Sequence, residues 1–457
     1  MIRPPAPPVR QEFFVPVARS PLPRAEADPG RRRVLAAMLG APVLATGGLT
    51  GCTEGRTAPE ETGPVELSVF WYGGAKRAEL TERVLRLYTD RNPRVGFRIT
   101  WQGAGGYYDR LATQAAGGNV PDLIQLDDSM LAEYARREIV LDLSGYVADH
   151  RLDLRTLPQG LVRYGQVDGR TVGVAAAQTA AAVVYDRTLL RRLRLPEPNT
   201  GMSWAEYVAW ARRVTRASDG RVAGTMDPSG DYRALWLWLR GQGGEFYRGR
   251  QLGFDADALI EWFDLWRRAR SSRATPSAAL VEQADGGEPI QQLVVTGATA
   301  ASFAWSHQLP ELQRLTDAEL GLAAMPGPPE AQWHRASMYW AAFRGTRHPD
   351  LVADVINFLT GNGEAGSVLG HERGLSPSLA VRSYVEGSIT EPAQRRAAAL
   401  GTALAARLGP APSPPPQGHP RVRALLLEAA ESIRGGRTGP RAATTRFMAR
   451  ADAALAG

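Results

Sequence analysis

Hydrophobic and polar positions alternate in a recognisable order at the start of the folded region. Residues 65–70 alternate as a strand does, and the apolar positions within 80–88 recur at helical spacing until Asn92-Pro93 ends that helix. The next elements are predicted as a strand at 95–101, a helix at 107–116 and a strand at 121–126. This order predicts right-handed crossovers and a mostly parallel sheet covered by helices, which is an α/β lobe.

A second group of strands and helices is predicted further along the chain. Short apolar or alternating runs predict five strands, at 172–174, 181–185, 300–305, 320–325 and 338–343. The capping-box residues Ser203 and Glu206 open a helix that extends to about residue 217. Apolar stripes predict further helices at 259–266 and 349–359, and two Ala/Arg-rich helices follow the Pro-rich loop 410–420. The chain therefore has material for a second α/β lobe.

Composition places the protein in the ordinary globular class. The 457 residues are 44% hydrophobic and 22% charged, which excludes a wholly disordered or fibrous chain. The net charge is +7, but residues 1–51 hold seven arginines against three acids, so the remainder carries only +3. Because a nucleic-acid footprint requires clustered basic residues, this distribution predicts no nucleic-acid partner.

The amino-terminal segment has the features of an export signal. Arg31-Arg32-Arg33 precedes an apolar stretch at 36–49, and Leu49-Thr50-Gly51-Cys52 resembles a bacterial lipobox. Cys52 is the only cysteine, so it is the predicted lipidation site, and disulfides and multi-thiolate metal sites are excluded. Residues 1–51 are predicted as a twin-arginine-like lipoprotein signal peptide, and residues 52–64 as a flexible tether.

Several short stretches, taken in order from about residue 65 to the end, resemble one known family. They are Asn92-Pro93-Arg94-Val95, Ala116–Leu123, Asp168–Val174, Val184–Leu190, Ser203–Tyr207, Gly297–Trp305, Ala323–Gly327 and Gly374–Pro377. Together they resemble the family 1 extracellular solute-binding proteins of ABC importers, the maltose-binding-protein-like group.

The resemblance implies an α/β, two-lobed periplasmic-binding-protein-like fold of type II, with the ligand cleft between lobes joined by crossing strands. Lobe 1 would comprise 65–174 and 338–383, and lobe 2 would comprise 178–334 and 388–457. The chain would cross near Val174–Gln178, Arg335–Met338 and Arg382–Gly387. Alanines at 175–177 replace a proline that the family often has there, so the local hinge geometry is expected to differ.

Catalytic motifs are absent from the sequence. There is no Gly-x-Ser-x-Gly elbow, no His-Glu-x-x-His and no P-loop, and the six histidines lack metal-ligand spacing. We therefore predict no enzyme activity, no metal and no cofactor. Asp127-Asp128 remains open as a carboxylate pair for a secreted glycosidase-like hydrolase.

Candidate ligand-binding residues follow the ends of predicted strands, where ligands of open α/β sheets bind. Flat aromatic rings cover the faces of a pyranose, and carboxylates and amides bind its hydroxyls. The candidates are Trp71, Tyr72, Asp127, Asp128, Gln178, Trp305 and Trp340, to which we add Trp236 and Arg373. For Trp236 and Trp238 a buried helix is equally compatible, and Arg373 is either a clamp for an anionic substituent or a surface residue. Helix and strand stripes predict Trp101, Trp262 and Trp266 in the core.

The leading functional prediction is a lipid-anchored, extracytoplasmic, monomeric substrate-capture protein that takes a sugar or oligosaccharide and delivers it to the ABC permease transmembrane subunits. Its anchor would hold it at the outer face of the cell membrane. A glycerol phosphodiester is the next solute class. Two further hypotheses are the hydrolase that uses Asp127 or Asp128 and a scaffold that kept the fold without a ligand.

Overall fold

A computed structural model describes residues 63–284, 289–387 and 389–456. The predicted signal peptide, Cys52 and nearly all of the predicted tether lie outside the described residues. In the part of the chain that is described, no helix is long and apolar enough to cross a membrane.

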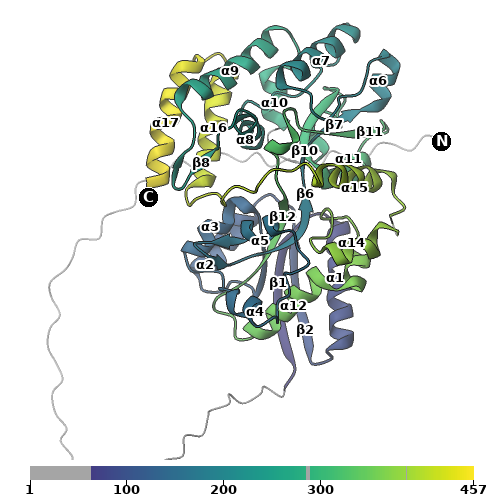
Figure 1. The fold of residues 1–457 in the computed structure, drawn as a ribbon, viewed down its shortest axis with the longest axis vertical. Coiled ribbons are helices and arrows are strands. Elements are labelled where there is room, and N and C mark those ends of the chain that lie inside the picture. The colour runs from purple at the N-terminus through teal and green to yellow at the C-terminus, as the bar shows by residue number, and fades with distance from the viewer. Residues whose placement is uncertain (1–62, 285–288, 388, 457) are drawn as a thin grey trace, which may run out of the picture. The chain divides into compact units, whose positions relative to one another are not determined.

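The first lobe is built on a five-stranded sheet with the order β2-β1-β3-β12-β6 (Figure 1). The three strands predicted between residues 65 and 126 are confirmed, and they pair in parallel. β12 runs antiparallel to both of its neighbours, β3 and β6. The strands are β1 (Val65–Tyr72), β2 (Val95–Gln102), β3 (Leu123–Leu126), β12 (Arg335–Ala342) and β6 (Val174–Thr179).

Helices cover this sheet because each has one apolar face. In α1, for example, Val84, Leu85 and Tyr88 are buried against the sheet while the opposite face is charged. The helices of lobe 1 are α1 (Ala75–Arg91), α2 (Tyr107–Ala116), α3 (Asp128–Arg136), α4 (Ser144–Ala148), α5 (Gln159–Tyr164), α12 (Pro349–Gly361), α13 (Gly363–Leu369) and α14 (Leu379–Glu386). A small hairpin of β4 (Gln166–Val167) and β5 (Arg170–Thr171) precedes β6.

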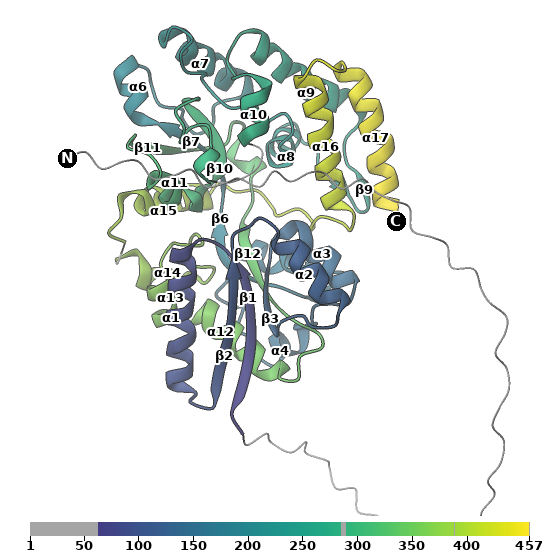
Figure 2. The same ribbon diagram turned by 180° about the vertical axis from the view of Figure 1, so that it is seen from behind.

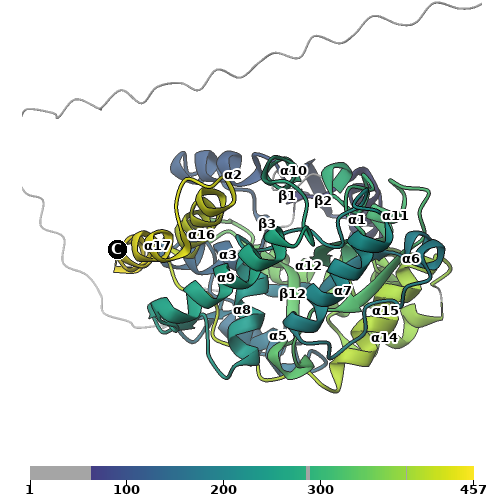
Figure 3. The ribbon, with the colours of Figure 1, turned by 90° about the horizontal axis from the view of Figure 1, so that it is seen from above.

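The second lobe has a three-stranded antiparallel sheet with the order β10-β7-β11. Its strands are β7 (Ala181–Asp186), β10 (Ala301–Trp305) and β11 (Leu320–Ala324), with a separate hairpin of β8 (Tyr247–Arg248) and β9 (Gln251–Leu252). Its helices are α6 (Arg187–Leu193), α7 (Trp204–Ala217), α8 (Tyr232–Gly241), α9 (Ala256–Ser271), α10 (Ala278–Ala284), α11 (Leu309–Gln313), α15 (Pro392–Ala405), α16 (His419–Arg434) and α17 (Pro440–Ala456). Figure 2 and Figure 3 show α16 and α17 side by side at one end of this lobe, near α9.

The capping box predicted at Ser203 and Glu206 is confirmed at the start of α7. Trp262 and Trp266 are fully buried in lobe 2, as predicted, and Trp204 meets Trp262 edge to face with ring centroids 5.3 Å apart. The core prediction for Trp101 is wrong, because its side chain is 40% exposed. Trp101 lies on β2, the edge strand of its sheet, so side chains of a neighbouring strand flank it on one side only.

Two neighbouring strands carry the chain between the lobes. β6 leaves the first sheet and continues through Ala180 into β7, the central strand of the second sheet. β12 returns from lobe 2 and pairs with β6, with register shifts around Met338. Near the third predicted crossing, Arg382–Gly387, helix α14 extends to residue 386, and the chain then continues to α15.

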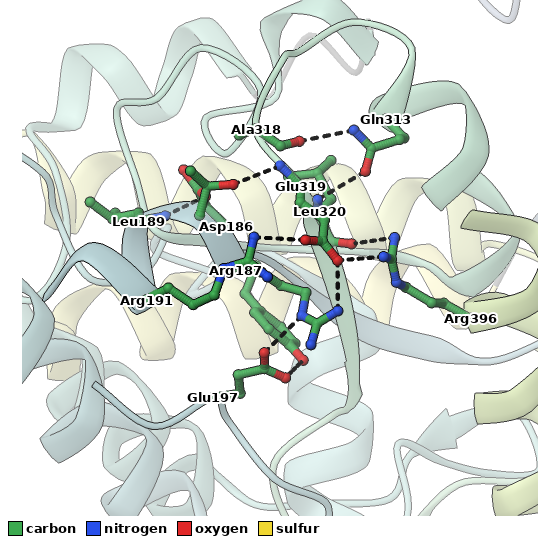
Figure 4. Close-up of polar contacts among 12 residues, drawn as sticks. Asp186, Arg187, Leu189, Arg191, Glu197, Gln313, Ala318, Glu319, Leu320 and Arg396 are labelled. Carbon is green, nitrogen blue, oxygen red and sulfur yellow. Dashed lines mark hydrogen bonds and ion pairs between the residues drawn. The ribbon is translucent and has the colours of Figure 1, made fainter. Parts of the chain in front are cut away.

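Helix α15 is held to lobe 2 by a network of ion pairs (Figure 4). The carboxylate of Glu319, just before β11, pairs with Arg396 of α15 and with Arg187 and Arg191 of α6. Arg187 also pairs with Glu197 at 2.7 Å, and Glu197 accepts a hydrogen bond from Tyr185. This network fixes the chain to lobe 2 as it arrives from α14.

Gly374 allows the loop before α14 to pack against β6. The backbone of Leu375 exchanges two hydrogen bonds with Gln178, of 2.7 and 2.9 Å. Gly374 has φ +119°, and a Cβ atom there would lie 2.3 Å from the carbonyl oxygen of Gln178. Only glycine adopts this positive φ without strain and also leaves room for the Gln178 carbonyl oxygen.

We expect Gly374→Ala to lower the free energy of unfolding by at least about 2 kcal/mol, since it combines backbone strain with a backbone clash. Gly220→Ala is the matched control, because Gly220 also has positive φ (+75°) but a Cβ atom there would meet nothing within 4 Å. Gly220→Ala should lower the free energy of unfolding by about 1 kcal/mol. Chemical denaturation of both variants checks this, and equal losses would contradict the packing role of Gly374.

Candidate functional site

A small pocket lies where the crossing strands meet lobe 2. Its free volume is about 10 Å³, roughly the space of one water molecule. With its side chains in these positions, the pocket is too small for a sugar ring. The lining residues are Ala180, Ala181, Arg233, Leu237, Trp305, Gln332, Trp333 and Arg335.

Two guanidinium groups lie over the ring of Trp305 in this pocket. The Arg335 Cζ atom is 4.6 Å from the Trp305 ring centroid, and the Arg233 Cζ atom is 5.0 Å from it. Arg335 also lies 5.5 Å from the ring centroid of Trp333, so its guanidinium contacts two tryptophans. These are cation–π contacts, and they occupy an aromatic surface suited to stacking.

Arg335 also joins the crossing strand to lobe 1. Its side chain forms a buried ion pair with Asp128, the first residue of α3, and donates to the Tyr232 hydroxyl at 2.9 Å. Asp128 further accepts a hydrogen bond from Tyr164. Burial raises the pKa of Asp128, while the positive charge of Arg335 opposes that change. Because each buried charge depends on the other, loss of either partner would be costly.

Asp127 has a structural role at the start of α3. Its side chain accepts from the backbone N–H of Ser129 at 2.9 Å and caps the helix, and its own N–H donates to the Tyr108 hydroxyl at 2.8 Å. Both members of the Asp127-Asp128 pair are thus engaged with protein groups. This arrangement does not favour the hydrolase hypothesis, which needs a carboxylate that faces the substrate.

Trp305 lines the pocket, and Tyr72 packs partly buried against Tyr107 and Tyr108. The other three tryptophans predicted at the cleft are buried in cores. Trp71 (0% exposed) and Trp340 (2%) pack in the core of lobe 1, and Trp236 (1%) packs in lobe 2, where its Nε1 donates to Glu245. β1 continues to Tyr72, so Trp71 lies within the strand and its side chain takes the covered face. Trp236 is on the buried face of α8, as is Trp238.

Gln178 and Arg373 lie beside the crossing, and both are buried. Gln178 accepts from Arg382 at 2.7 Å. Arg373 is 4% exposed, so the prediction of a surface position for it is wrong. Its guanidinium donates to Thr81 Oγ1 at 2.8 Å and lies 5.3 Å from the Trp340 ring centroid.

Several residues at the cleft escape the sequence-based prediction. They are Arg77, Arg233, His307, Trp333, Arg335 and Arg423. Trp333 offers a usable signal, because it comes two residues before the predicted crossing at Arg335. The arginines offer none, since the chain holds many and most are exposed.

The chain belongs to a known family of binding proteins. The sequence model described as "Bacterial extracellular solute-binding protein" matches residues 73–366, more than half of the chain. Members of this family bind small solutes such as sugars and work with ABC permeases.

Individual relatives agree with this assignment. An uncharacterized lipoprotein in the oleD 5' region of Streptomyces antibioticus is 27% identical over 172 residues, which is 36% of this chain and 37% of that protein. A family 1 extracellular solute-binding protein of Alicyclobacillus acidocaldarius has a similar structure, with 24% identity, a TM-score of 0.65, and 87% of this chain and 100% of that chain covered.

An oligogalacturonide-binding protein of Yersinia enterocolitica, solved with saturated digalacturonic acid, has 19% identity and a TM-score of 0.71, over 86% of this chain and 98% of that chain. These structures share the two-lobed fold of periplasmic binding proteins, and the fold class predicted from the sequence is confirmed.

His307, on the turn after β10, provides a test of the cleft electrostatics. Burial, together with the charges of Arg77 and Arg373, lowers the pKa of His307 to about 3, and its Nδ1 is 2.9 Å from the Thr179 hydroxyl. The imidazole is therefore neutral in the folded protein at neutral pH, whereas in the unfolded chain it takes up a proton near pH 6.5.

We expect this histidine to destabilise the protein as the pH falls below 6.5, since only the unfolded state then binds the proton. Between pH 7.5 and pH 5 the cost approaches about 2 kcal/mol. His307→Asn removes this titration, so the stability of the variant should depend less on pH than that of the wild type. Denaturation at both pH values checks this, and parallel pH profiles would contradict the assignment.

Proposed function

We propose that the protein is the lipid-anchored, extracytoplasmic solute-binding component of an ABC importer, and that it captures a sugar or oligosaccharide between its lobes. The observation that carries the proposal is the pocket at the lobe junction, where Trp305 and Trp333 stand beside Arg233, Gln332 and Arg335. Binding sites for small ligands combine an apolar wall with a few convergent polar groups, and this pocket has both.

The pocket suggests how capture would proceed. A pyranose ring would take the place over Trp305 that the Arg335 guanidinium now occupies. Arg335 and Gln332 would then donate to the hydroxyls of the solute. Closure of the two lobes around the crossing strands β6 and β12 would create the surface that the permease subunits recognise.

Lipid anchoring is supported by the sequence and by a relative. Cys52 ends a lipobox-like segment, and the Streptomyces antibioticus relative is named a lipoprotein. Anchoring would hold the protein at the outer face of the cell membrane, next to its permease. Glycerol phosphodiesters remain the second solute class.

A binding screen tests the proposed function directly. Titration calorimetry against mono- and oligosaccharides and glycerol phosphodiesters, with product analysis of the same samples, separates capture from hydrolysis. Binding of a sugar without turnover supports the proposal. Formation of product, or the absence of binding across the panel, would overturn it.

Trp305→Ala should weaken sugar affinity roughly 30-fold, because truncation of a central aromatic residue costs ~2 kcal/mol of binding. Its effect on unfolding should be small, since Trp305 is only partly buried. Trp262→Ala is the control, because Trp262 is fully buried in lobe 2 and should cost roughly 3–5 kcal/mol of stability. Calorimetry and denaturation of both variants separate the two roles, and the reverse pattern would place Trp305 in the core.

Cys52→Ser should give a correctly folded protein without a lipid anchor, since the chain has no other cysteine to modify. Phase separation in detergent, applied to cells that express each form, measures the anchor. The wild type should enter the detergent phase and the variant the aqueous phase. A variant that still enters the detergent phase would show that Cys52 is not the anchoring residue.

A further inference from the structure

Two buried arginines, Arg77 and Arg373, meet in lobe 1 beside the crossing strands. Arg77 is 7% exposed and Arg373 is 4% exposed. Arg77 lies in the first turn of α1, and Arg373 lies in the loop before α14. Arg77 donates to the carbonyl oxygen of Glu372, the residue before Arg373, across 295 residues of sequence. Thr81 links the pair, because its hydroxyl accepts from Arg373 and donates to the carbonyl oxygen of Arg77.

The protein partners of these two guanidiniums are uncharged. Arg77 donates to the carbonyl oxygens of Tyr72 and Glu372, both at 3.4 Å, and Arg373 donates to Thr81 and to Gln125 Oε1. Among the described residues, no carboxylate lies within the 4 Å of an ion pair of either guanidinium. The charge of Glu372 opposes the lowering of the Arg373 pKa by burial and by Arg77, but the carboxylate of Glu372 forms no ion pair with either guanidinium.

Arg335, a third buried arginine, differs from Arg77 and Arg373 in having an ion-pair partner. Arg335, which is 5% exposed, has the carboxylate of Asp128 as its partner. Burial and the charge of Arg77 lower the pKa of Arg373, whereas Asp128 raises the pKa of Arg335. A buried charge without a counter-charge is costly, so its retention needs another reason.

Both arginines keep a free donor and are held in place by their surroundings. Arg77 Nε and Arg373 Nη1 are buried and have no acceptor in the protein. Gly73 gives the Arg77 side chain its room, since a Cβ atom there would lie 2.4 Å from Arg77 Cδ. Trp340 supports the Arg373 guanidinium from one side. The positions of the donors are therefore fixed before any ligand arrives.

Lobe 2 places His307 beside this region. Its Nδ1 is 2.9 Å from the Thr179 hydroxyl at the end of β6, and the neighbouring Gln178 pairs with the backbone of Leu375, two residues after Arg373. Described groups from both lobes thus converge on a site that favours negative charge.

We propose that this cluster of Arg77, Arg373 and His307 binds an anionic group, a carboxylate or a phosphate, on the captured solute. The inference rests on the proposed function and specifies its substrate class as an acidic sugar or a sugar-like phosphate ester. Arginine forks bind both oxyanions with paired hydrogen bonds. The segment Trp305–His307 connects the two ends of the cleft: Trp305 lines the aromatic pocket, and His307, two residues on, belongs to the cationic cluster.

The test compares each charged probe with its neutral counterpart by calorimetry. Digalacturonate is compared with galactobiose, and glycerol 3-phosphate with glycerol, so the two arms separate carboxylate from phosphate recognition. The charged member of at least one pair should bind about tenfold to a hundredfold more tightly, the range expected for hydrogen bonds to a charged group. Arg373→Gln and Arg77→Gln should each reduce that ratio to within about threefold.

Arg98→Gln is the matched control, because it makes the same charge change in lobe 1 at a side chain that is 71% exposed. It should leave the ratio as in the wild type. A general loss of folded protein lowers the apparent affinity for the charged and the neutral probe alike, so it leaves their ratio unchanged. Equal or tighter binding of the neutral members, or an unchanged ratio in both cleft variants, would overturn the inference while leaving sugar capture intact.

Inorganic phosphate allows a second test of the anion site that does not depend on the identity of the solute. Sodium phosphate, compared with sodium chloride at equal ionic strength, should raise the melting temperature of the wild type by about 2 °C or more through binding to the folded state. Arg373→Gln should lose this increase. If no sugar or ester binds, the proposed function fails and this arm still decides the anion site: equal melting temperatures in phosphate and chloride for the wild type would overturn it.

Discussion

The pairing of β6 with β12 is the constraint on which the rest of the structure depends. These two strands lie together at one edge of the lobe 1 sheet: β6 carries the chain to lobe 2, and β12 brings it back. Because β6 passes directly into β7, the residues between these strands can contact both lobes. Thr179 and Ala180 therefore contact the turn at Ser306 and His307, and Arg335 at the start of β12 reaches Asp128 in lobe 1. The pocket at this junction is lined by residues of lobe 2 together with Ala180 and Arg335 of the crossing segments.

The charges of the cleft divide into two kinds, which have different consequences. Arg335 is balanced by Asp128, so that pair stabilises the contact between the lobes when the aromatic pocket holds only protein side chains. Arg77 and Arg373 form no ion pair among the described residues, and at the proposed anion site a negatively charged group of the solute would offset their cost. The same cleft thus combines a surface for a ring with a site for a charge.

The sequence predicts the architecture well and the site only in part. Strand and helix periodicity locates both sheets, and it correctly assigns Trp262 and Trp266 to the core, because burial in these elements repeats along the chain. Trp71 shows the limit: the strand predicted at 65–70 extends two residues further, to Tyr72, and this places the Trp71 side chain in the core and not at the cleft. Arg373 is a candidate from the sequence, but nothing local predicts its proximity to Arg77, since the two meet only when the chain returns after nearly 300 residues.

Capture by closure of two lobes is the central claim, and small-angle scattering in solution tests it most directly. With no solute, a cleft-closing protein populates open arrangements around the crossing strands. Saturation with a tight-binding solute should therefore reduce the radius of gyration measurably, and dilution of the solute should restore it. A scattering curve that is the same without solute and at saturation would contradict the account.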